Sequence, residues 1–497
     1  MAENEVWELV RPPPGANIVE SKWHYTPKFD SEGEIASYKS RLVAKGFTQV
    51  YGVDYFETFA LVVRFDSLRL ILAIAVSLDL ELWQVDFESA FLNGKMKEEV
   101  YMRQPEGFVA EGKEDHVCRL LRSLYGTMQA GHTWWHELDR AYSDLGYIRS
   151  RVDESVRSRR VADELTLLST YTDDVTGAST SSGGAIQAKQ ELRGRYKLKD
   201  GGELNYMLGI KVERDRANRT ISISQSAYIA RILKRFRHED CTPASTPLPP
   251  GTKLSDINSP ENDAERSEMS KLPYRELLGS LMYLYIGTRP DLSFAIQYLS
   301  RYQANPGQAH WNAALHVLRY LKGTIDLKIT YSASGLLTPV GYADADLGGC
   351  LDTGRSTSGY VFIACGGPIC WSSKRQQRIS TSTTEAEYKA LCHAGQTALW
   401  VDNFFSEIGV EVDRPLTIYT DNKGALDISK HATQHGKTRH FKLDSFWLRE
   451  VVQEEELVLK LIPSGMNLAD VFTKVVTRDQ FIRVREMLGM SREVAAS

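Results

Sequence analysis

The chain has 497 residues, of which 42% are hydrophobic and 25% are charged, and its formal net charge is −4. This length and composition are typical of a protein with two or three domains, and the charge does not exclude a nucleic-acid enzyme, which needs positive charge only along its channel. No run of 18 apolar residues is present and residues 1–10 do not form a signal peptide, which argues against membrane insertion and secretion. The six cysteines contain no C-x-x-C pair, which argues against a disulfide framework and favours a reducing compartment.

The first predicted elements are a β-ribbon, helices and a short strand. Residues 21–47 have the pattern of a ribbon around the turn Asp30–Ser31–Glu32–Gly33, with basic residues on the second arm. Apolar residues at helical spacing predict a helix over 66–80. An apolar strand then ends at Asp86, where a helix starts, and another helix over 133–146 ends at a glycine.

The middle of the chain contains the best candidate for a linker. Residues 241–273 are rich in Pro, Ser and Asn and poor in apolar residues. Helical patterns follow between 274 and 324. From Leu327 onward, three strands, a helix over 383–409 and a strand over 416–422 give the order βββαβ.

The stretch 168–177, LSTYTDDVTG, places two like charges, Asp173 and Asp174, in a β-prone run. Because successive strand residues point to opposite faces, both carboxylates cannot face solvent from a regular strand. One interpretation is an ordinary turn, since Asp and Gly are common turn formers. The other is a hairpin tip that offers carboxylate oxygens to a divalent metal ion. Asp86 would supply a third carboxylate, although a lone Asp at a strand-to-helix junction is more often a helix N-cap.

Acidic residues recur in the C-terminal third of the chain. Asp344 lies in the strand pattern YADAD, and a helix opens with Glu385 and Glu387. A further strand ends at Asp421, and Asp470 follows in PSGMNLADVFTK. Each of these residues taken alone is by default a surface acid or a helix cap.

Many motifs, in one order, resemble the reverse transcriptase of copia-type (Pseudoviridae-like) LTR retrotransposon Pol polyproteins. They include VDFESAFLNG, VYMRQPEGF, LYGTMQAGHTWW, YTDDV, LNYMLGIKVERD and YRELLGSLMYLYIGTRPDLSFAIQYLSRY. The resemblance covers nearly the whole chain, and over 336–475 it extends to the ribonuclease H of the same family. So many ordered motifs are far more specific than one short match.

The resemblance implies an α/β (α+β) fold class with three regions. Residues 1–240 would form a right-hand polymerase with fingers, palm and thumb. Residues 241–335 would form the linker and a connection module. Residues 336–490 would form a ribonuclease H-like domain with a mixed five-stranded sheet.

For the polymerase, the resemblance assigns metal-binding, nucleotide-binding and primer-binding residues. The carboxylates Asp86, Asp173 and Asp174 would hold two metal ions for nucleotidyl transfer. Arg41 would hold the triphosphate, because the forked guanidinium of an arginine suits phosphate. Phe91 would pack under the incoming sugar and exclude a 2′-hydroxyl, and the alternative for Phe91 is an ordinary core residue. The nucleotide-binding residues are Arg41, Lys45, Phe91 and Gln129, and the primer-supporting turn is Leu208–Gly209. From Lys189 to Arg237 there are 13 Lys and Arg against 5 Asp and Glu, which would line the template–primer groove.

For the ribonuclease H region, the resemblance assigns a second set of metal ligands. They are Asp344, Glu387, Asp421 and Asp470, with Glu385 as the second choice for the helix position. Ligand sets made only of oxygen suit Mg²⁺, with Mn²⁺ as the alternative, and we expect two ions per site.

The chain departs from the family pattern at four places. Thr172 stands where the family has Val, and Leu61 replaces a Pro. The segment 127–132 replaces LKQAPR and loses two positive charges, so we expect a weaker grip on the template. The segment 464–467 lacks the His that precedes the last Asp in many ribonucleases H, so product release would be slower there.

Two further patterns suggest other sites. Asp352–Thr353–Gly354 is the triplet of aspartic proteases, but Arg355 follows where a small apolar residue is needed, so a turn between two strands is the better interpretation. His431 and His435 have metal-ligand spacing on a helix, but no third ligand is evident and solvated histidines are the better interpretation.

The resemblance therefore predicts an RNA-directed and DNA-directed DNA polymerase with ribonuclease H activity. Its partners would be an RNA template, a DNA primer, an RNA–DNA hybrid and dNTPs, with no membrane, and the oligomeric state stays open. It would act in cytoplasmic virus-like particles, or in the nucleus. The alternative is a catalytically inactive or host-recruited remnant that binds nucleic acid, because the chain lacks a zinc-knuckle nucleocapsid, a credible protease and an integrase core.

Overall fold

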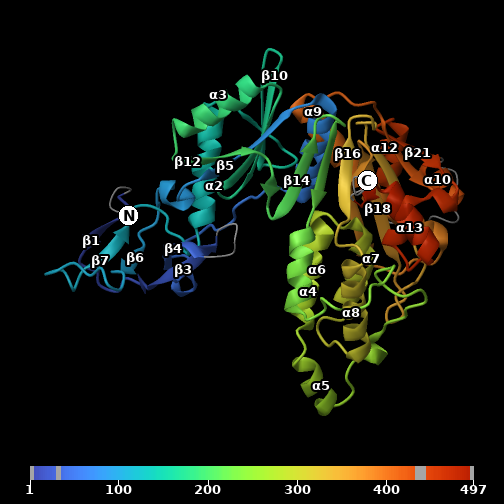
Figure 1. Cartoon of the computed structure of the whole chain (residues 1–497), viewed down its shortest axis with the longest axis horizontal. Coiled ribbons are helices and arrows are strands. Elements are labelled where there is room, and N and C mark those ends of the chain that lie inside the picture. Colours follow the sequence, from blue (N-terminus) through green and yellow to red (C-terminus); the bar gives the residue numbers. More distant parts are fainter. Residues whose placement is uncertain (1–4, 30–34, 431–443, 493–497) are drawn as a thin grey trace. The chain divides into compact units, whose positions relative to one another are not determined.

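Two structural units share the chain, and the chain passes between them three times (Figure 1). The computed structural model describes residues 5–29, 35–430 and 444–492. The first unit consists of Met1–Arg64 and Glu81–Glu203, and the second of Phe65–Leu80 and Leu204–Ser497. The units are therefore not divided at 240 and 335, and those boundaries stay a prediction about function.

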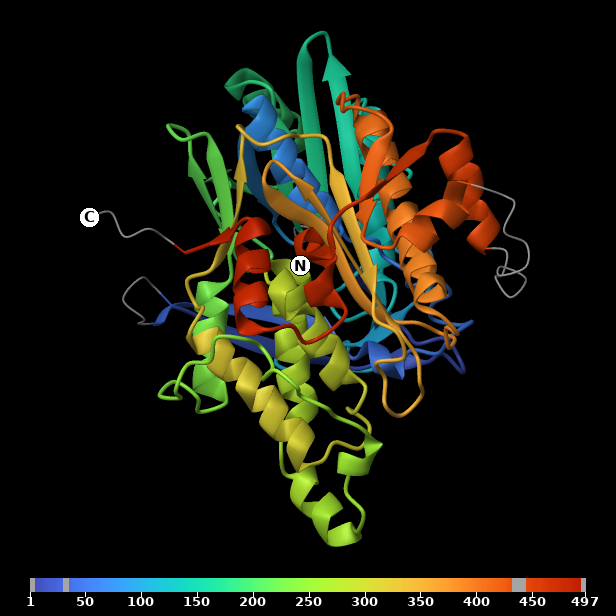
Figure 2. The same cartoon turned by 90° about the vertical axis from the view of Figure 1, so that its right-hand side faces the viewer.

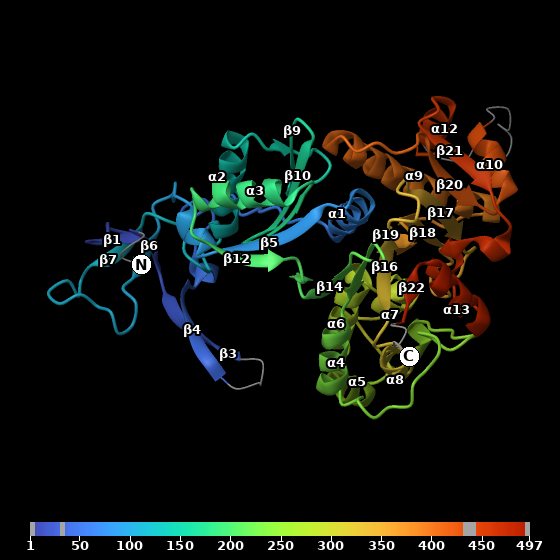
Figure 3. The ribbon, with the colours of Figure 1, turned by 45° about the horizontal axis from the view of Figure 1, so that its top comes forward.

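A six-stranded antiparallel sheet is the largest element of the first unit, with the order β12-β5-β11-β10-β9-β8. Helices α2 (Ala130–Asp144) and α3 (Ser182–Arg193) cover one face of this sheet (Figure 3). On that face Trp83, Val85 and Phe87 of β5 enter the core. Because strand residues alternate, Asp86 points to the opposite face. The strands are β5 (Glu81–Phe87), β8 (Ile148–Arg149), β9 (Val156–Val161), β10 (Glu164–Tyr171), β11 (Asp174–Ser179) and β12 (Leu198–Glu203).

The N-terminal part of the first unit contains two smaller sheets. The predicted ribbon is present as β3 (Ser21–Phe29) paired with β4 (Ile35–Ala44). A four-stranded sheet has the order β1-β7-β6-β2, and Val19, Leu42 and Met102 are among the residues of its core. Its strands are β1 (Trp7–Val10), β2 (Ile18–Val19), β6 (Tyr101–Arg103) and β7 (Val117–Leu120), and two short 3₁₀ helices are η2 (Gly46–Thr48) and η3 (Ala90–Asn93).

In the second unit, a five-stranded sheet joins distant parts of the sequence in the order β13-β14-β15-β16-β22. Met490 near the C-terminus lies opposite Ile329 of β16. The strands are β13 (Tyr206–Met207), β14 (Ile210–Asp215), β15 (Thr220–Ser224), β16 (Lys328–Ser332) and β22 (Met490–Ser491). The helices of this part are α4 (Ser226–Arg235), α5 (Asp263–Ser270), α6 (Tyr274–Gly287), α7 (Ser293–Ser300) and α8 (Gln308–Lys322).

Helix α1 (Phe65–Leu78) belongs to the second unit, where it packs against β15, β16 and β19. Its buried Arg69 donates hydrogen bonds to the backbone carbonyls of Ile286 at 2.7 Å and Ile369 at 2.7 Å. The Arg69 guanidinium also lies 3.8 Å from the ring centre of Trp371. All three partners are more than 200 residues away in sequence, so distant parts of the chain hold α1 in place.

The C-terminal region, coloured orange to red in Figure 2, contains a mixed sheet. The order of its strands is β19-β18-β17-β20-β21. Strands β17, β18 and β19 are antiparallel neighbours, whereas β17, β20 and β21 run parallel. The strands are β17 (Val340–Ala345), β18 (Thr357–Ala364), β19 (Gly367–Arg375), β20 (Leu416–Thr420) and β21 (Leu457–Leu461). The accompanying helices are α9 (Thr383–Ile408), α10 (Lys423–Lys430), α12 (Asp444–Gln453), η7 (Leu468–Phe472) and α13 (Arg478–Met487).

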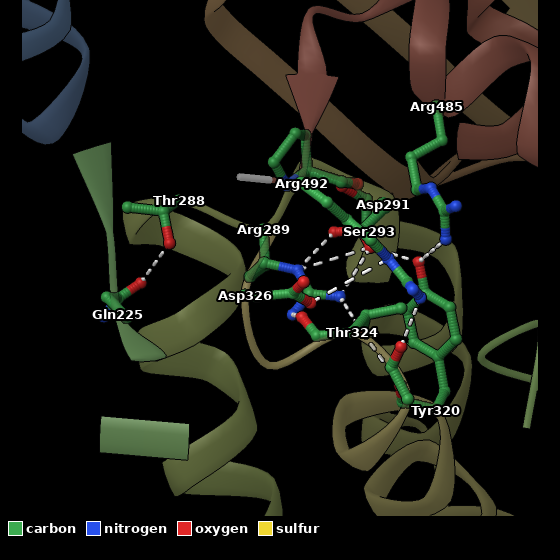
Figure 4. Close-up of polar contacts among 12 residues, drawn as sticks. Gln225, Thr288, Arg289, Asp291, Ser293, Tyr320, Thr324, Asp326, Arg485 and Arg492 are labelled. Atoms are coloured by element: carbon green, nitrogen blue, oxygen red, sulfur yellow. Dashed lines mark hydrogen bonds and ion pairs between the residues drawn. The ribbon is translucent and has the colours of Figure 1, made fainter. Parts of the chain in front are cut away.

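A buried ionic network joins the helical region to α13 (Figure 4). Arg289 and Asp291, each with a side chain 1% exposed, form an ion pair of 2.8 Å. The hydroxyl of Tyr320 donates to Asp291 at 2.5 Å, and Arg289 also donates to the hydroxyl of Thr324 at 2.8 Å. Arg485 of α13 donates to the Tyr320 hydroxyl at 3.1 Å. The network therefore fixes α13, which follows the segment containing Asp470.

The predicted linker is folded onto the second unit. Its Thr246, Leu248 and Leu254 are buried. The hydroxyl of Tyr298 donates to the Leu254 carbonyl at 2.9 Å and accepts a hydrogen bond from the Leu254 amide at 2.7 Å. Residues 241–273 are therefore attached to the second unit although they contain few apolar residues. A few buried apolar side chains and backbone hydrogen bonds hold them there.

The predicted helices are present, with small shifts at their ends. Helix α1 begins one residue before the predicted 66, and α2 begins three residues before the predicted 133. The helix start expected after Asp86 is the short 3₁₀ helix η3. Within the part of the chain that the structure describes, no helix is both long enough and apolar enough to span a membrane.

Candidate active sites

The adjacent acids of YTDDV occupy the tip of the β10–β11 hairpin. Tyr171 lies opposite Asp174, so Thr172 and Asp173 form a two-residue turn, and Thr172 has a positive φ of 58°. The backbone amide of Phe87 donates to the Asp173 carbonyl at 2.9 Å. Asp173 is therefore a turn residue and Asp174 begins a strand, which agrees with the turn interpretation, whereas metal binding by this tip stays a prediction.

Asp86 and Asp174 are direct cross-strand neighbours in the antiparallel β5–β11 ladder. Like charges placed opposite each other are destabilising in a sheet. Burial, followed by the charge of Asp173, raises the pKa of Asp86, while Lys39 and Lys199 act in the other direction. Burial and the charges of Asp173 and Asp86 raise the pKa of Asp174 to about 6. A bound cation would remove this repulsion, although the three side chains, all within the described residues, do not offer ligand atoms that all lie within 4.8 Å of one another.

An aromatic and basic group lies beside these carboxylates. The rings of Phe91 and Tyr125 meet edge to face with centroids 4.9 Å apart, and the guanidinium of Arg41 lies 5.7 Å from the Tyr125 ring centre. Burial and the charge of Asp173 raise the pKa of Tyr125, so its hydroxyl is within electrostatic reach of the cluster. Tyr125 was not predicted as a site residue, although it lies within the motif LYGTMQAGHTWW.

Two other predicted nucleotide-binding residues have protein partners. Lys45 forms an ion pair of 2.6 Å with Glu20. Gln129 is buried, donates to the Asp54 carbonyl at 2.8 Å and accepts from Gln49 at 3.1 Å. Gln129 therefore fastens the segment around Asp54 to the start of α2, and its nucleotide-binding role stays a prediction.

Leu208 and Gly209 form the turn between β13 and β14 in the second unit. Both have positive φ, 49° and 75°, as a two-residue hairpin turn with two left-handed residues requires. The Tyr283 hydroxyl donates to the Leu208 carbonyl. Tyr283 therefore fixes the turn, and the turn's role in primer binding stays a prediction.

Many basic residues between Lys189 and Arg237 are paired with acids. Lys189 lies 2.7 Å from Asp200, and Arg195 lies 2.9 Å from Asp144. Other members pair with Glu213, Asp79 and Glu276, and the stretch extends over both units. This pairing reduces the charge available for a template, so the predicted groove lining stays a prediction.

A second carboxylate cluster lies at one edge of the mixed sheet. Asp344 is near the end of β17, Asp421 directly follows β20, and these parallel neighbours end at the same edge. Glu387 reaches the cluster from the second turn of α9. One oxygen atom from each of the three carboxylates lies within 4.8 Å of the others.

Asp470 joins this cluster through a lysine. Lys474 lies 2.7 Å from Asp470 and 3.5 Å from Asp344. Gln480 donates to the other oxygen of Asp470 at 2.7 Å, and the Thr473 hydroxyl donates to Asp344. Lys474 and Thr473 were not predicted as site residues, although both lie close after Asp470 in the motif PSGMNLADVFTK.

The electrostatics of the second cluster are those of an incomplete cation site. Burial, then the charges of Asp344 and Asp421, raise the pKa of Glu387 to about 9. Burial also raises the pKa of Asp344 to about 6. The buried Oε2 of Glu387 has no hydrogen-bond partner among the described residues. Buried acceptors without a donor are costly, so an oxygen-liganded divalent cation fits this donor set.

The remaining acidic candidates have partners outside the two clusters, and the two histidines lie outside the described residues. Glu385 accepts from the Thr381 amide at 2.8 Å and pairs with Lys389 at 2.8 Å, so it caps the start of α9 outside the cluster. Asp352 lies in the turn between β17 and β18 and accepts from the Asp256 amide at 2.8 Å, as the turn interpretation expects. His431 and His435 lie outside the described residues.

Comparison with known proteins identifies the family. The sequence model of the family "Reverse transcriptase (RNA-dependent DNA polymerase)" matches residues 4–250. Over 491 residues the chain is 38% identical to the retrovirus-related Pol polyprotein from transposon TNT 1-94 of Nicotiana tabacum. This alignment covers 99% of this chain and 37% of the polyprotein. It is 32% identical to the putative transposon Ty5-1 protein of Saccharomyces cerevisiae over 61% of this chain and 97% of that protein. The chain belongs to the copia-type retrovirus-related Pol polyproteins.

The match to this Pol family extends over nearly the whole chain, but the chain spans only about a third of the length of the Pol polyproteins that it matches. One similar solved structure is the foamy viral protease-reverse transcriptase in complex with double-stranded DNA. It is 11% identical with a TM-score of 0.20, covering 91% of this chain and 66% of that chain. The predicted family is thus confirmed by sequence similarity. The similarity to the foamy viral structure is too low to support any inference about this chain.

Proposed function

We propose that this Pol chain is an RNA-directed and DNA-directed DNA polymerase with ribonuclease H activity. The observation on which this rests is the pairing of Asp86 with Asp174 beside Asp173, within the residues matched by the reverse transcriptase family. The second carboxylate cluster, in the other unit, supports the nuclease activity. The fold would be a right-hand polymerase followed by a connection module and a ribonuclease H-like domain.

The residues of the polymerase site would divide three tasks among them. Asp86, Asp173 and Asp174 would hold two Mg²⁺ ions, with Mn²⁺ as an alternative. When bound, such ions lower the pKa of an attacking hydroxyl and stabilise the leaving oxygen of a phosphoryl transfer. Arg41 would contact the triphosphate of the dNTP. Phe91, supported by the Tyr125 ring, would form the wall against the sugar.

In the nuclease site, Asp344, Glu387 and Asp421 would hold the ions, and Asp470 would complete the set. Glu387 is suited to this task because one of its buried oxygens has no donor in the described structure. Lys474 now neutralises Asp344 and Asp470, and it would keep these carboxylates in place before cations arrive. The substrate would be the RNA strand of an RNA–DNA hybrid.

The template and primer would bind through positive charge and through the fixed turn Leu208–Gly209. Basic residues between Lys189 and Arg237 would contact phosphates, which would require some of their present ion pairs to open. We place this activity in cytoplasmic virus-like particles or in the nucleus.

Two assays on the full chain test the proposal. Primer extension on poly(rA)·oligo(dT) with Mg²⁺ should give DNA synthesis, and a labelled RNA strand hybridised to DNA should be cleaved. Binding of both substrates without extension or cleavage would contradict the proposal and support the alternative of an inactive, nucleic-acid-binding remnant.

A further inference from the structure

A group of two histidines and a glutamate lies in the first unit, apart from both carboxylate clusters. His132 and His136 are one helical turn apart on α2, and Glu57 approaches from the preceding loop. One ligand atom from each side chain lies within 4.8 Å of the other two. His132 stands where the family pattern LKQAPR has its arginine, so the family resemblance does not predict this group.

The hydrogen bond of His132 sets which of its nitrogens can bind a metal. Its Nδ1 lies 2.9 Å from the backbone carbonyl of Phe59. A carbonyl only accepts, so Nδ1 carries the hydrogen, and in the neutral ring Nε2 keeps its lone pair. Metal-binding histidines commonly donate from the other ring nitrogen in this way, which fixes the tautomer and orients the ring.

The distance from His132 to Glu57 fits two ligands of one ion. Nε2 of His132 lies 3.2 Å from Oε2 of Glu57. Two ligands of a tetrahedral Zn²⁺, each with a bond of about 2.0–2.1 Å, lie about 3.3 Å apart. A neutral His132 and an ionised Glu57 would otherwise direct lone pairs at each other. Without a metal, this contact needs a proton between Nε2 and Oε2.

His136 completes the group from the same helix. Its ring lies edge to face with that of His132, with centroids 4.4 Å apart. His136 is exposed, so its ring is open to a metal ion from solvent. The charge of Lys97 opposes a bound cation at this position, whereas the charges of Asp139 and Glu57 favour one.

We propose that Glu57, His132 and His136 bind one Zn²⁺ ion, with a water molecule completing the coordination. Two imidazoles and one carboxylate suit zinc and similar transition metals, whereas Mg²⁺ prefers oxygen ligands only. The ion has a structural task, because it joins the loop of Glu57 to the first turns of α2. On the same helix, the indole of Trp134 donates to the Thr172 carbonyl at 2.7 Å. Zinc therefore strengthens the support of the YTDDV turn.

The test is zinc binding by the full chain in the presence of millimolar Mg²⁺, which competes with zinc for the oxygen ligands of the carboxylate clusters. Affinity is measured by competition with a chromophoric chelator, and the zinc-dependent rise in Tm by thermal unfolding. Glu57→Gln is the first variant, because its side chain is 76% exposed and its loss removes little packing. His136→Gln is the second. His116→Gln is the matched control, since His116 also contacts a carboxylate, that of Asp115 at 2.7 Å.

We expect the wild type and His116→Gln to bind one zinc ion with the same affinity. Glu57→Gln and His136→Gln should each bind about tenfold more weakly or worse, and should lose the rise in Tm. The Tm of each variant without zinc shows that it is folded. Unchanged affinity in both variants, or no zinc bound by the wild type at micromolar concentration, would overturn the proposal and leave only a metal-free contact between His132 and Glu57.

Discussion

Asp86 lies directly opposite Asp174 across the β5–β11 ladder, so two like charges face each other on the same side of the sheet. Cross-strand neighbours of this kind repel each other, and here Asp173 adds a third charge at the turn. A protein gains nothing in stability from this arrangement without a cation. The first prediction follows from that cost.

Replacing both turn acids, Asp173→Asn with Asp174→Asn, should abolish DNA synthesis and leave the fold intact. The amides lack the negative charge that would hold two divalent cations, but they remove repulsion at a metal-free tip. The measurement is primer extension with Mg²⁺, together with Tm in EDTA, which should be equal to or above that of the wild type. Retained extension by the double variant would exclude these residues from the polymerase site.

Phe91→Ala should lower the selectivity for deoxyribonucleotides. The side chain that packs against Tyr125 would form a steric wall, and alanine leaves space for a 2′-hydroxyl. The measurement is the ratio of dNTP to rNTP incorporation, with Phe91→Tyr as a control that keeps the bulk. An unchanged ratio in Phe91→Ala would make Phe91 an ordinary packing residue.

Asp421→Asn should stop cleavage of RNA in an RNA–DNA hybrid while primer extension continues. Asp421 lies in the cluster with Asp344 and Glu387, whereas Asp86 belongs to the other unit. One gel with labelled RNA hybridised to a DNA primer reports both activities. Cleavage at the wild-type rate would show that Asp421 is only a strand-end acid, and loss of both activities would contradict the separation of the sites.

The pH dependence of metal-free stability should reveal Glu387. Its folded-state pKa of about 9 lies above the ordinary value of 4.5, so the folded state binds this proton more tightly than the unfolded state. Stability in EDTA should therefore fall as the pH rises from about 4.5 to about 9, and Mg²⁺ should reverse the loss.

Glu385, on the same helix as Glu387, provides the control for the effect of pH on stability. At pH 8.5 in EDTA, Glu387→Gln should raise Tm, by about 2–4 °C for each kcal/mol gained. Glu385→Gln should lower it, because Glu385 accepts from Thr381 and pairs with Lys389. Equal changes of Tm in the two variants would argue against the charge of Glu387 as the cause.

Asp291→Asn should destabilise the second unit by about 3–5 kcal/mol, because it leaves the buried charge of Arg289 without its partner. The control is Asp326→Asn, which removes an exposed pair with Arg492 at 3.9 Å and should cost less than about 1 kcal/mol. Urea unfolding measures both. A similar loss of unfolding free energy in the two variants would contradict the claim that the buried Arg289–Asp291 pair matters more for stability than the exposed one.

The sequence was most informative where structure is local. Alternation and turn residues predicted the ribbon of β3 and β4, and apolar spacing predicted α1 to within one residue at its start. The site carboxylates are assigned by the family resemblance, because each one taken alone would be a turn residue, a surface acid or a helix cap.

The sequence could not predict relationships that depend on distant packing. The composition of residues 241–273 indicated a linker, but contacts such as that of Leu254 with Tyr298 attach this stretch to the second unit. Tyr125 and Lys474 join their clusters through side-chain direction, which no spacing rule specifies. The place of α1 depends in the same way on bonds from Arg69 to residues near the other end of the chain.

Helix α1 gives the domain boundary a practical meaning. The reverse transcriptase family match ends at residue 250, yet β16 and β19, against which α1 packs, lie beyond residue 320. A fragment that stops at 250 would expose the apolar side chains of Leu70, Ile71 and Ile74, which are now buried, just before the strand of Asp86. The segment recognised as one sequence module is therefore not one folding module, because α1 lies within it and packs against strands that lie beyond it.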